Sequence, residues 1–423
     1  MRRFFSSPVT KTMSSYAAAR TAATGKNVWV EFIDLALKYK PANLGQGFPD
    51  FAPPTFLKQA LARAAMIDSL NQYTRSKGHG RLVQAIAKYY SPLHKKEIDP
   101  MNNILVTVGA YGALYCGINS LVDSGDEVVV IEPFFDSYLP CIKAAGGIPK
   151  CVPLRPKSKE VLLSADLTLD PDELAAAFSS KTKAVLLNTP NNPTGKVFER
   201  KELEMIADLC KKHDAICVSD EVYEYLVYEG EHIRIATLPG MWERTLTIGS
   251  AGKAFSVTGW KIGWTIGPAE LIAAAHSIMV NCNYTCATPL QEGVALAFER
   301  EWEQKGKNDS YFVELPSVLK EKRAEIVKML NDVGMKPIIP QGGYFILADT
   351  APLNVSFEGE DAYDFQFCRW LTKSKGIAAI PSSAFYSREH SHLAGKCVRF
   401  CFGKSESTLQ AARARFEEWK KEF

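Results

Sequence analysis

The chain has 423 residues, of which 46% are hydrophobic and 23% are charged, and its 50 basic and 47 acidic side chains leave a formal net charge of +3. This length and composition predict a folded chain of two or three domains and exclude disorder or a coiled coil as a description of the whole. A charge balance this even gives no basic footprint for nucleic acid, and the longest apolar runs are far shorter than a membrane span, so neither partner is expected.

The first 26 residues differ from the rest because they are basic and rich in serine. They contain Arg2, Arg3, Lys11, Arg20 and Lys26, and no acidic residue precedes Glu31. Arginine and serine without acidic residues are typical of a mitochondrial transit peptide, although a frayed basic tail has the same composition. We therefore expect a basic leader over residues 1–26 and a mitochondrial or cytoplasmic location.

After the leader, strand patterns alternate with helix patterns. Strands are predicted over 104–108, 128–131, 150–153, 184–188, 216–219, 246–249 and 262–266. Helices are predicted over 56–67, 82–90, 111–122, 139–145, 174–178 and 203–213. Alternation at this spacing is typical of βαβ units, so we predict an α/β fold with a mainly parallel sheet that has helices on both faces.

The alternation stops near residue 312. A long amphipathic helix is predicted over 319–333, followed by strands over 336–339 and 344–348, a helix over 363–373, a strand over 398–402 and a charged final helix. Few strands with helices on one side indicate a smaller α+β domain. The Gly-, Asp- and Glu-rich segment 354–361 is predicted to be a surface loop.

The ten cysteines have no C-x-x-C spacing, and most lie in apolar stretches, as Cys217 does. A reduced thiol in such a stretch is a small hydrophobic side chain, so the cysteines indicate a reducing compartment rather than a disulfide framework. His390 and His392 have no cysteine at ligand spacing, so no metal site is predicted.

Polar residues that follow predicted strands are the main candidates for a site, because ligands of open α/β sheets bind at the carboxyl ends of the strands. Asp220 would place a carboxylate at the floor of a cleft, and Tyr223 follows it by three residues. Lys253 follows a strand in a loop that contains Ser and Gly. An amine enclosed in such a site loses its proton more easily and acts as a nucleophile or a base.

Two further strand ends would supply a phosphate site and an amide. Gly109 opens a helix, whose free N–H groups bind phosphate, with Ser250 and Lys261 beside them. Asn192 lies in the turn 190–195. Taken singly, each signal has an ordinary alternative, namely a surface lysine, a helix N-cap or a simple turn. Together, a carboxylate, a phenol, an amide, an enclosed lysine and a phosphate cradle match pyridoxal 5′-phosphate (PLP).

Three long motifs at these strand ends resemble those of a fold-type I, class I aminotransferase. They are Asn188-x-Pro-x-Asn-Pro-x-Gly195, Ser219-Asp-Glu-Val-Tyr223 and Ser250-Ala-Gly-Lys-x-Phe-x-x-x-Gly-Trp-Lys-x-Gly-Trp264. The segments 28–32, 43–50, 241–245 and 398–402 are similar to the kynurenine–oxoglutarate transaminase family, which is also known for glutamine transaminase and cysteine-S-conjugate β-lyase activity. The resemblance extends from about Asn27 to the C-terminus.

The resemblance implies the PLP-dependent transferase fold of type I, with a seven-stranded sheet. The large PLP-binding domain would cover 48–311, and the small domain 27–47 and 312–423. It also implies a homodimer with shared active sites that moves the amino group of kynurenine, of another aromatic or sulfur-containing amino acid, or of glutamine to a 2-oxo acid by a ping-pong mechanism.

Residue roles follow from the same resemblance. Lys253 would hold PLP and carry the proton, Asp220 would pair with the ring nitrogen, and Tyr223 and Asn192 would contact the 3′-oxygen, with Asn188 nearby and Phe135 stacked on the ring. The phosphate would be held by Gly109, Ala110, Tyr111, Ser250 and Lys261, joined by Tyr73 of the partner subunit. The substrate would contact Gly47, Trp29 and Asn192, and Arg399 would clamp its α-carboxylate, because the planar guanidinium binds carboxylates bidentately.

The sequence departs from the family pattern in two places. Ala254 stands where family members commonly have Thr, and 74–80 reads Thr-Arg-Ser-Lys-Gly-His-Gly instead of a Gly-Phe-Gly-His-Pro-like run. The segment 284–289 leans towards the branch with Thr rather than His at the position that faces the neighbouring subunit. Because 74–80 would form part of the rim of the site, the substrate range follows less directly from the resemblance than the reaction type does.

Three other interpretations compete with the aminotransferase. Ser250-x-x-Lys253 fits a serine acyl enzyme, but the partner motifs K-T-G and S-D-N are absent from the sequence. A non-catalytic relative of the fold would be expected to lose the lysine or the acid, and both are present. A cysteine-S-conjugate β-lyase would use the same site, so the sequence does not separate it from a transaminase.

Overall fold

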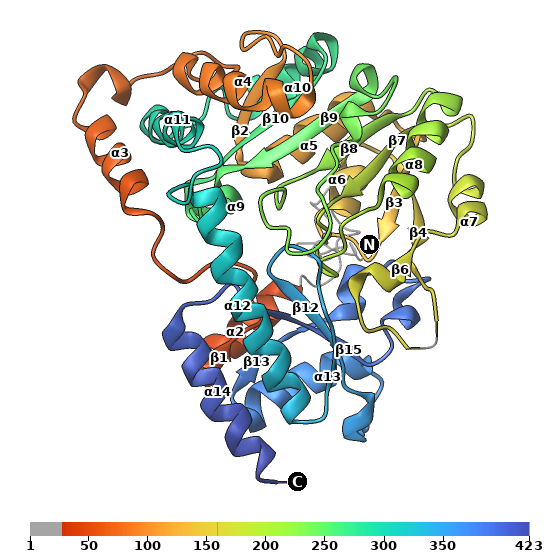
Figure 1. The fold of residues 1–423 in the computed structure, drawn as a ribbon. Coiled ribbons are helices and arrows are strands. Elements are labelled where there is room, and N and C mark those ends of the chain that lie inside the picture. The colour runs from red at the N-terminus through yellow and green to blue at the C-terminus, as the bar shows by residue number, and fades with distance from the viewer. Residues whose placement is uncertain (1–27, 159, 423) are drawn as a thin grey trace, which may run out of the picture.

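The protein is described by a computed structural model over residues 28–158 and 160–422, and the predicted leader over 1–26 lies outside the described residues. The choice between a mitochondrial and a cytoplasmic location therefore stays a prediction. Figure 1 shows a larger part built around one sheet and a smaller part built around another. None of the described helices is long and apolar enough to cross a bilayer.

A seven-stranded sheet forms the centre of the larger part, in the order β2-β10-β9-β8-β7-β3-β4. Its strands are β2 (Ile104–Val108), β3 (Glu127–Glu132), β4 (Ile148–Pro153), β7 (Thr182–Asn188), β8 (Ile216–Asp220), β9 (Thr245–Ser250) and β10 (Ile262–Ile266). Neighbouring strands pair in parallel, except that β10 runs antiparallel to both β2 and β9. The predicted α/β fold with a mainly parallel seven-stranded sheet is confirmed.

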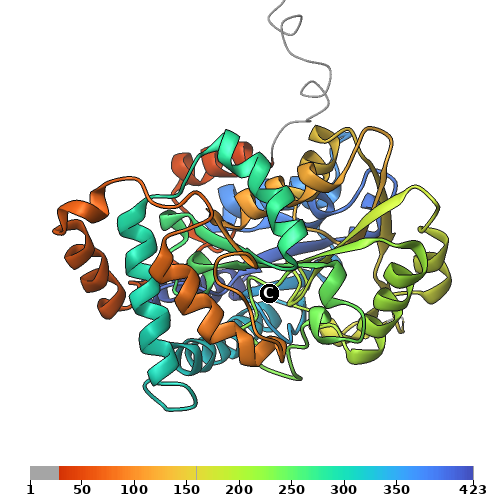
Figure 2. The ribbon, with the colours of Figure 1, turned by 90° about the horizontal axis from the view of Figure 1, so that it is seen from above.

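Helices cover both faces of this sheet (Figure 2). The helices of the larger part are α3 (Thr55–Ala65), α4 (Gly80–His94), α5 (Gly109–Leu121), α6 (Tyr138–Ala144), α7 (Pro171–Ala176), α8 (Arg200–His213), α9 (Ala251–Ala254), α10 (Ala269–Cys282) and α11 (Thr288–Glu303), of which α3 packs against α11 rather than on the sheet. In β3, Val128 and Val130 belong to the hydrophobic cluster that contains α5 and α6, whereas Val129 and Ile131 belong to the cluster that contains α7 and α8. Alternate strand residues therefore point to opposite buried faces.

The smaller part contains a four-stranded antiparallel sheet in the order β11-β12-β15-β14. Its elements are α2 (Val28–Tyr39), β1 (Ala42–Asn43), β11 (Lys336–Ile338), β12 (Phe345–Asp349), α13 (Tyr363–Trp370), β13 (Ile377–Ala378), β14 (Ile380–Pro381), β15 (Cys397–Cys401) and α14 (Glu406–Lys420). The long helix α12 (Tyr311–Asp332) runs from the larger part into the smaller one (Figure 1). The domain boundaries at 47/48 and 311/312 stay predictions.

Several predicted elements differ from the structure. Lys253 lies in the short helix α9 rather than in a loop, and the helix predicted over 319–333 begins at Tyr311. Helix α7 begins earlier than predicted because the Asp170 side chain caps it, accepting hydrogen bonds from the first N–H groups of the helix. The predicted loop 354–361 is confirmed, since it contains no helix or strand.

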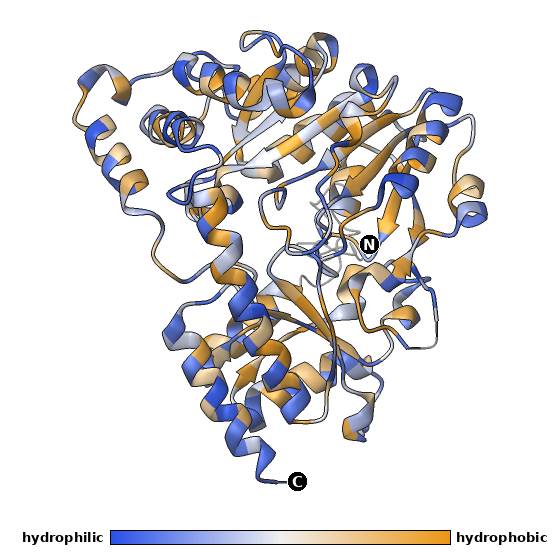
Figure 3. Cartoon of the chain, viewed as in Figure 1, coloured by the Kyte–Doolittle hydropathy of each residue, from blue (hydrophilic) through white to orange (hydrophobic). Residues whose placement is uncertain are grey.

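Helices α10 and α11 were not predicted at all. Helix α11 buries polar side chains, including Gln291, Glu292 and Glu301, alongside apolar ones, so its sequence has no clean amphipathic stripe. The outer helix α14 differs from α11, because hydrophilic residues dominate it (Figure 3). The strands of both sheets are mainly hydrophobic in the same view.

Candidate active site

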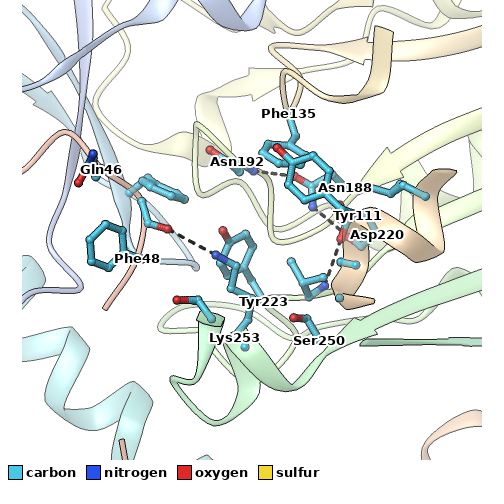
Figure 4. A pocket seen from close by; sticks show the side chains of 18 of the residues that line it. Gln46, Phe48, Tyr111, Phe135, Asn188, Asn192, Asp220, Tyr223, Ser250 and Lys253 are labelled. Atoms are coloured by element: carbon cyan, nitrogen blue, oxygen red, sulfur yellow. Dashed lines mark hydrogen bonds between the residues drawn. The ribbon is translucent and has the colours of Figure 1, made fainter. Parts of the chain in front are cut away.

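The carboxyl ends of the large-sheet strands and the inner strands β12 and β15 of the small sheet line a cavity of 380 Å³ (Figure 4). The cavity is lined by every residue that the sequence assigned to cofactor or substrate except Tyr73, namely Trp29, Gly47, Gly109, Ala110, Tyr111, Phe135, Asn188, Asn192, Asp220, Tyr223, Ser250, Lys253, Lys261 and Arg399. Residues that are far apart in the sequence are therefore brought together at one place.

Lys253 extends from α9 into the cavity. Its Nζ donates hydrogen bonds to Tyr344 Oη at 2.6 Å and to the Gly47 carbonyl at 3.4 Å. Burial lowers the pKa of the lysine to about 8, because the ammonium form loses its hydration. A substantial fraction of the amine is therefore neutral near pH 8, and a neutral amine is the form that acts as a nucleophile or a base.

Asp220 ends β8 and is almost completely buried. Its Oδ2 accepts a hydrogen bond of 2.7 Å from Tyr138 Oη, while its backbone carbonyl accepts one of 2.9 Å from the Asn188 side chain. Burial raises the pKa of this carboxyl to about 6, and the bond from Tyr138 works in the opposite direction. The carboxylate is therefore ionised at neutral pH, ready to bind a cationic ring nitrogen.

Arg399 lies in the central strand β15 of the small sheet and is only 1% exposed. Its Nη1 donates to Asn192 Oδ1 at 2.9 Å and its Nη2 donates to the Gly45 carbonyl at 3.2 Å. Its Nε is buried and has no hydrogen-bond partner within 28–158 and 160–422. Burial lowers the pKa to about 10, so the guanidinium stays charged at neutral pH and is suited to bind a carboxylate.

Aromatic side chains surround this guanidinium. The rings of Phe345, Phe385 and Trp29 lie with their centroids 4.1, 4.7 and 5.3 Å from its central carbon. The indole Nε1 of Trp29 also donates to Asp136 Oδ2 at 2.6 Å, which fixes the ring at the edge of the cavity. This end of the cavity therefore combines one cation with an apolar, aromatic wall.

The amino end of α5 supplies the other polar end of the cavity. The first N–H groups of a helix have no partner within the helix, and here they belong to Gly109, Ala110 and Tyr111. Lys261 lies beside them, with its Nζ 5.0 Å from the centre of the Tyr111 ring. Ser250 ends β9 next to this group and lines the same cavity.

Two glycines keep this helix start open. A Cβ at Gly109 would come within 3.3 Å of Lys261 Nζ, and a Cβ at Gly263 would lie 2.7 Å from the backbone nitrogen of Ala110. N–H groups at a helix start beside a lysine and a hydroxyl form an anion cradle. With a buried carboxylate and a lysine of lowered pKa in the same cavity, the residues present fit PLP.

Behind the cavity, the turn after β8 is anchored in a buried ion cluster. Asp220 and Tyr223 line the cavity, whereas their sequence neighbours Glu221 and Glu224 bind away from it. Glu221 pairs with His232 at 2.8 Å, and Arg234 pairs with Glu224 and lies 3.8 Å from Glu221. The cluster ties both cavity residues to the core.

Tyr73 does not line the cavity of its own chain. Its side chain is 84% exposed, and its ring lies edge-on to the ring of Tyr284, with the centroids 5.2 Å apart. The neighbouring segment that departs from the family pattern is held by its own contacts, since Ser76 Oγ lies 2.8 Å from His276 Nε2 and His79 Nε2 lies 3.0 Å from Glu292. Nothing in the structure explains why Ala254 stands at its position.

Sequence reasoning missed several residues of this site. Tyr138 and Tyr344 bind Asp220 and Lys253, and Gln46, Phe48 and Phe345 line the cavity. Tyr138 follows Phe135 by three residues and is the first residue of α6, so its closeness to Phe135 in the sequence was a usable signal. Tyr344 follows two glycines at the start of a strand and carries no such signal.

Comparisons with known proteins agree with this geometry. A family model for aminotransferase class I and II matches residues 39–416. Kynurenine–oxoglutarate transaminase 3 of Mus musculus is 52% identical over 408 residues, which cover 95% of this chain and 90% of that protein. Kynurenine–oxoglutarate transaminase 1 of Homo sapiens is 48% identical over 416 residues, covering 96% and 99%. Among solved structures, Bna3p of Saccharomyces cerevisiae superposes with a TM-score of 0.89 at 34% identity, covering 95% and 98%.

Proposed function

The chain belongs to the class I and II aminotransferase family, and from this premise we propose that it moves the amino group of kynurenine, or of another aromatic or sulfur-containing amino acid or glutamine, to a 2-oxo acid by a ping-pong mechanism. The cofactor of this reaction is PLP. Kynurenine and oxoglutarate are the substrates in the names of the similar transaminases. The lining of the cavity supports the proposal that this chain acts on the same substrates.

The observation that carries this proposal is that Arg399 and Lys253 line one cavity together with aromatic side chains. Arg399 would bind the α-carboxylate of the amino acid through its charged guanidinium. The side chain of the substrate would then lie among Trp29, Phe48 and Phe345, which favour an aromatic or apolar group.

Each polar residue of the cavity would have its own role in the reaction. When bound, PLP supplies an aldehyde that reacts with amines and a ring that accepts electrons. Lys253 would hold the cofactor through Nζ and, once displaced by the substrate amine, would take the proton from the substrate Cα and return it as an acid. Asp220 would bind the ring nitrogen, while Tyr223 and Asn192 would donate hydrogen bonds to the 3′-oxygen. The α5 start, Ser250 and Lys261 would hold the phosphate.

The first test is the visible absorbance of the purified protein with PLP. We expect a visible band that disappears on addition of kynurenine, as the cofactor takes up the amino group, and returns on addition of 2-oxoglutarate. Lys253→Ala should not show the cycle, whereas Lys58→Ala, a substitution of an exposed lysine on α3, should behave as wild type. A wild-type protein that remains colourless with PLP would refute the proposal. Release of pyruvate from a cysteine S-conjugate would show β-elimination at the same site.

We also propose that the enzyme is a homodimer in which Tyr73 of the partner subunit completes the phosphate site. The exposure of Tyr73 and its position outside the cavity of its own chain support this arrangement. Tyr73→Phe should weaken PLP binding roughly tenfold, the effect of one lost hydrogen bond to a charged group. Tyr39→Phe, another exposed phenol, is the control. A fully active monomer in sedimentation experiments would contradict the shared site.

A further inference from the structure

The amine of Lys253 has a defined position on the chain itself. Its Nζ lies 2.6 Å from Tyr344 Oη and 3.4 Å from the carbonyl oxygen of Gly47. Tyr344 Oη in turn donates to the same Gly47 carbonyl at 3.2 Å. The three atoms form a closed triangle in which the phenol accepts from the lysine and donates to the backbone.

Tyr344 is fixed by contacts that do not involve Lys253. The side chain is 1% exposed, and its ring meets the Tyr223 ring edge-on at 5.1 Å. A Cβ at Gly403 would come within 3.1 Å of the Tyr344 ring, so this glycine makes the space that the ring fills. The Tyr344 carbonyl accepts from the Phe402 N–H at 3.0 Å. The position of the Tyr344 hydroxyl is therefore fixed by contacts that do not depend on where the Lys253 side chain lies.

We propose that Tyr344 Oη and the Gly47 carbonyl form a docking position that holds the Lys253 amine whenever it is not bonded to the cofactor. This inference rests on the proposed function, in which the lysine must leave the cofactor and then carry a proton. A long side chain released into a cavity has many rotamers, and a fixed acceptor reduces them to one. Because Tyr344 touches the reacting atom, it is a catalytic residue in this scheme.

The groups around the Lys253 amine determine how its pKa changes when the Tyr344 hydroxyl is removed. The titratable and charged groups that face Lys253 are Asp220 on β8, Arg399 and Cys401 on β15, Lys261 before β10, and the phenols Tyr223 and Tyr344. Burial raises the pKa of Tyr344 well above its usual value, so its phenol stays protonated and accepts from the ammonium form of the lysine. Removing this acceptor destabilises the ammonium and lowers the pKa of Lys253.

The test compares wild type with Tyr344→Phe as full-length protein free of cofactor. Lys253 is acetylated with acetic anhydride at a series of pH values, and its modification rate is followed by mass spectrometry. We expect a midpoint near pH 8 for wild type, as its lowered pKa implies. The midpoint of Tyr344→Phe should be lower by roughly one pH unit, the effect of one hydrogen bond to a charged group.

Tyr228→Phe is the matched control. Its half-buried side chain donates from the hydroxyl to the Gly343 carbonyl, directly before Tyr344, so its loss disturbs the same turn without touching the lysine. The control should keep the wild-type midpoint. If Tyr344→Phe does not fold, a nuclear Overhauser contact between the Lys253 ε-methylene and the Tyr344 ring in labelled wild type decides the question, and its absence would overturn the docking position.

A second measurement uses the enzyme loaded with PLP in a single turnover with an amino acid. Tyr344→Phe should slow the half-reaction roughly tenfold and increase the isotope effect of an α-deuterated substrate, while the apparent affinity for the amino acid is unchanged. A wild-type acetylation midpoint together with a wild-type isotope effect in Tyr344→Phe would overturn the inference. Failure of the proposed function would be visible separately, as a wild-type protein that does not take up PLP.

Discussion

The substitution Tyr138→Phe tests how the protein keeps Asp220, the carboxylate proposed to bind the PLP ring nitrogen, ionised. The phenol is 2% exposed, and burial raises its pKa well above the usual value, so it acts as a donor to Asp220 Oδ2 over 2.7 Å. This bond favours the charged form of a carboxyl whose pKa burial has already raised to about 6. Removing the oxygen should raise the pKa of Asp220 further, by roughly one unit if the bond contributes about 1.4 kcal/mol.

The consequence is a change in the pH range over which PLP is retained. Only the ionised acid binds the ring nitrogen, so affinity is present above the pKa of Asp220 and is lost as the pH falls through it. At pH 7 the ionised fraction would drop from about ten elevenths to about one half, and at pH 8.5 the two proteins would differ little. The dissociation constant of PLP, measured from pH 5.5 to 8.5, should therefore turn upward near pH 7 in the variant instead of near pH 6.

The comparison between the two proteins cancels the titration of PLP itself. Tyr363→Phe removes a phenol whose hydroxyl contacts Thr350 in the smaller part of the molecule, and it should keep the wild-type profile. If Tyr138→Phe also keeps that profile, the hydroxyl does not hold the carboxylate and the reasoning is refuted.

Two further predictions concern the carboxylate clamp and the ion cluster. Arg399→Lys loses the planar guanidinium that binds Asn192 and a carboxylate together. KM for amino acids should therefore rise about 10- to 100-fold while the visible PLP band is kept. An unchanged KM would show that Arg399 does not bind the substrate carboxylate. Arg234→Met leaves Glu221 and Glu224 without their buried cation and should cost about 3–5 kcal/mol of unfolding free energy in urea. Arg200→Met, which breaks an exposed pair on α8, should cost less than about 1 kcal/mol, and equal losses would contradict the role of burial.

Much of the larger part was predictable because its strands are short apolar runs bounded by polar residues. The strands over 104–108 and 262–266 were predicted with the bounds that the structure gives. Their direction was not predicted, because the alternation of strands and helices favours parallel pairing, whereas β10 runs antiparallel to both of its neighbours, β2 and β9. The residues at the strand ends were predictable because Asp220, Lys253 and Gly109 belong to long motifs.

The supporting residues were harder to predict, for a physical reason. Tyr344 and Tyr138 act through single hydroxyl groups. Tyr138 lies close to Phe135 in the sequence, whereas Tyr344 looks like an ordinary core aromatic because nothing near it in the sequence marks a site. Helix α11 is covered on several sides, which erases the periodicity that reveals a surface helix. What sequence reasoning lacked in these cases was the identity of the neighbouring element rather than the residue type.

The position of Arg399 in the central strand of the small sheet has a consequence for synthesis on the ribosome. The chain emerges from its N-terminus, so Trp29 and Gly47 are made first, and Lys253 follows after more than two hundred further residues. Arg399 belongs to the last 25 of the 423 residues, and β15 pairs with both β12 and β14. A nascent chain would therefore complete its cofactor cradle well before it gains the guanidinium that binds amino acids. Substrate recognition would be the last property of the site to be acquired.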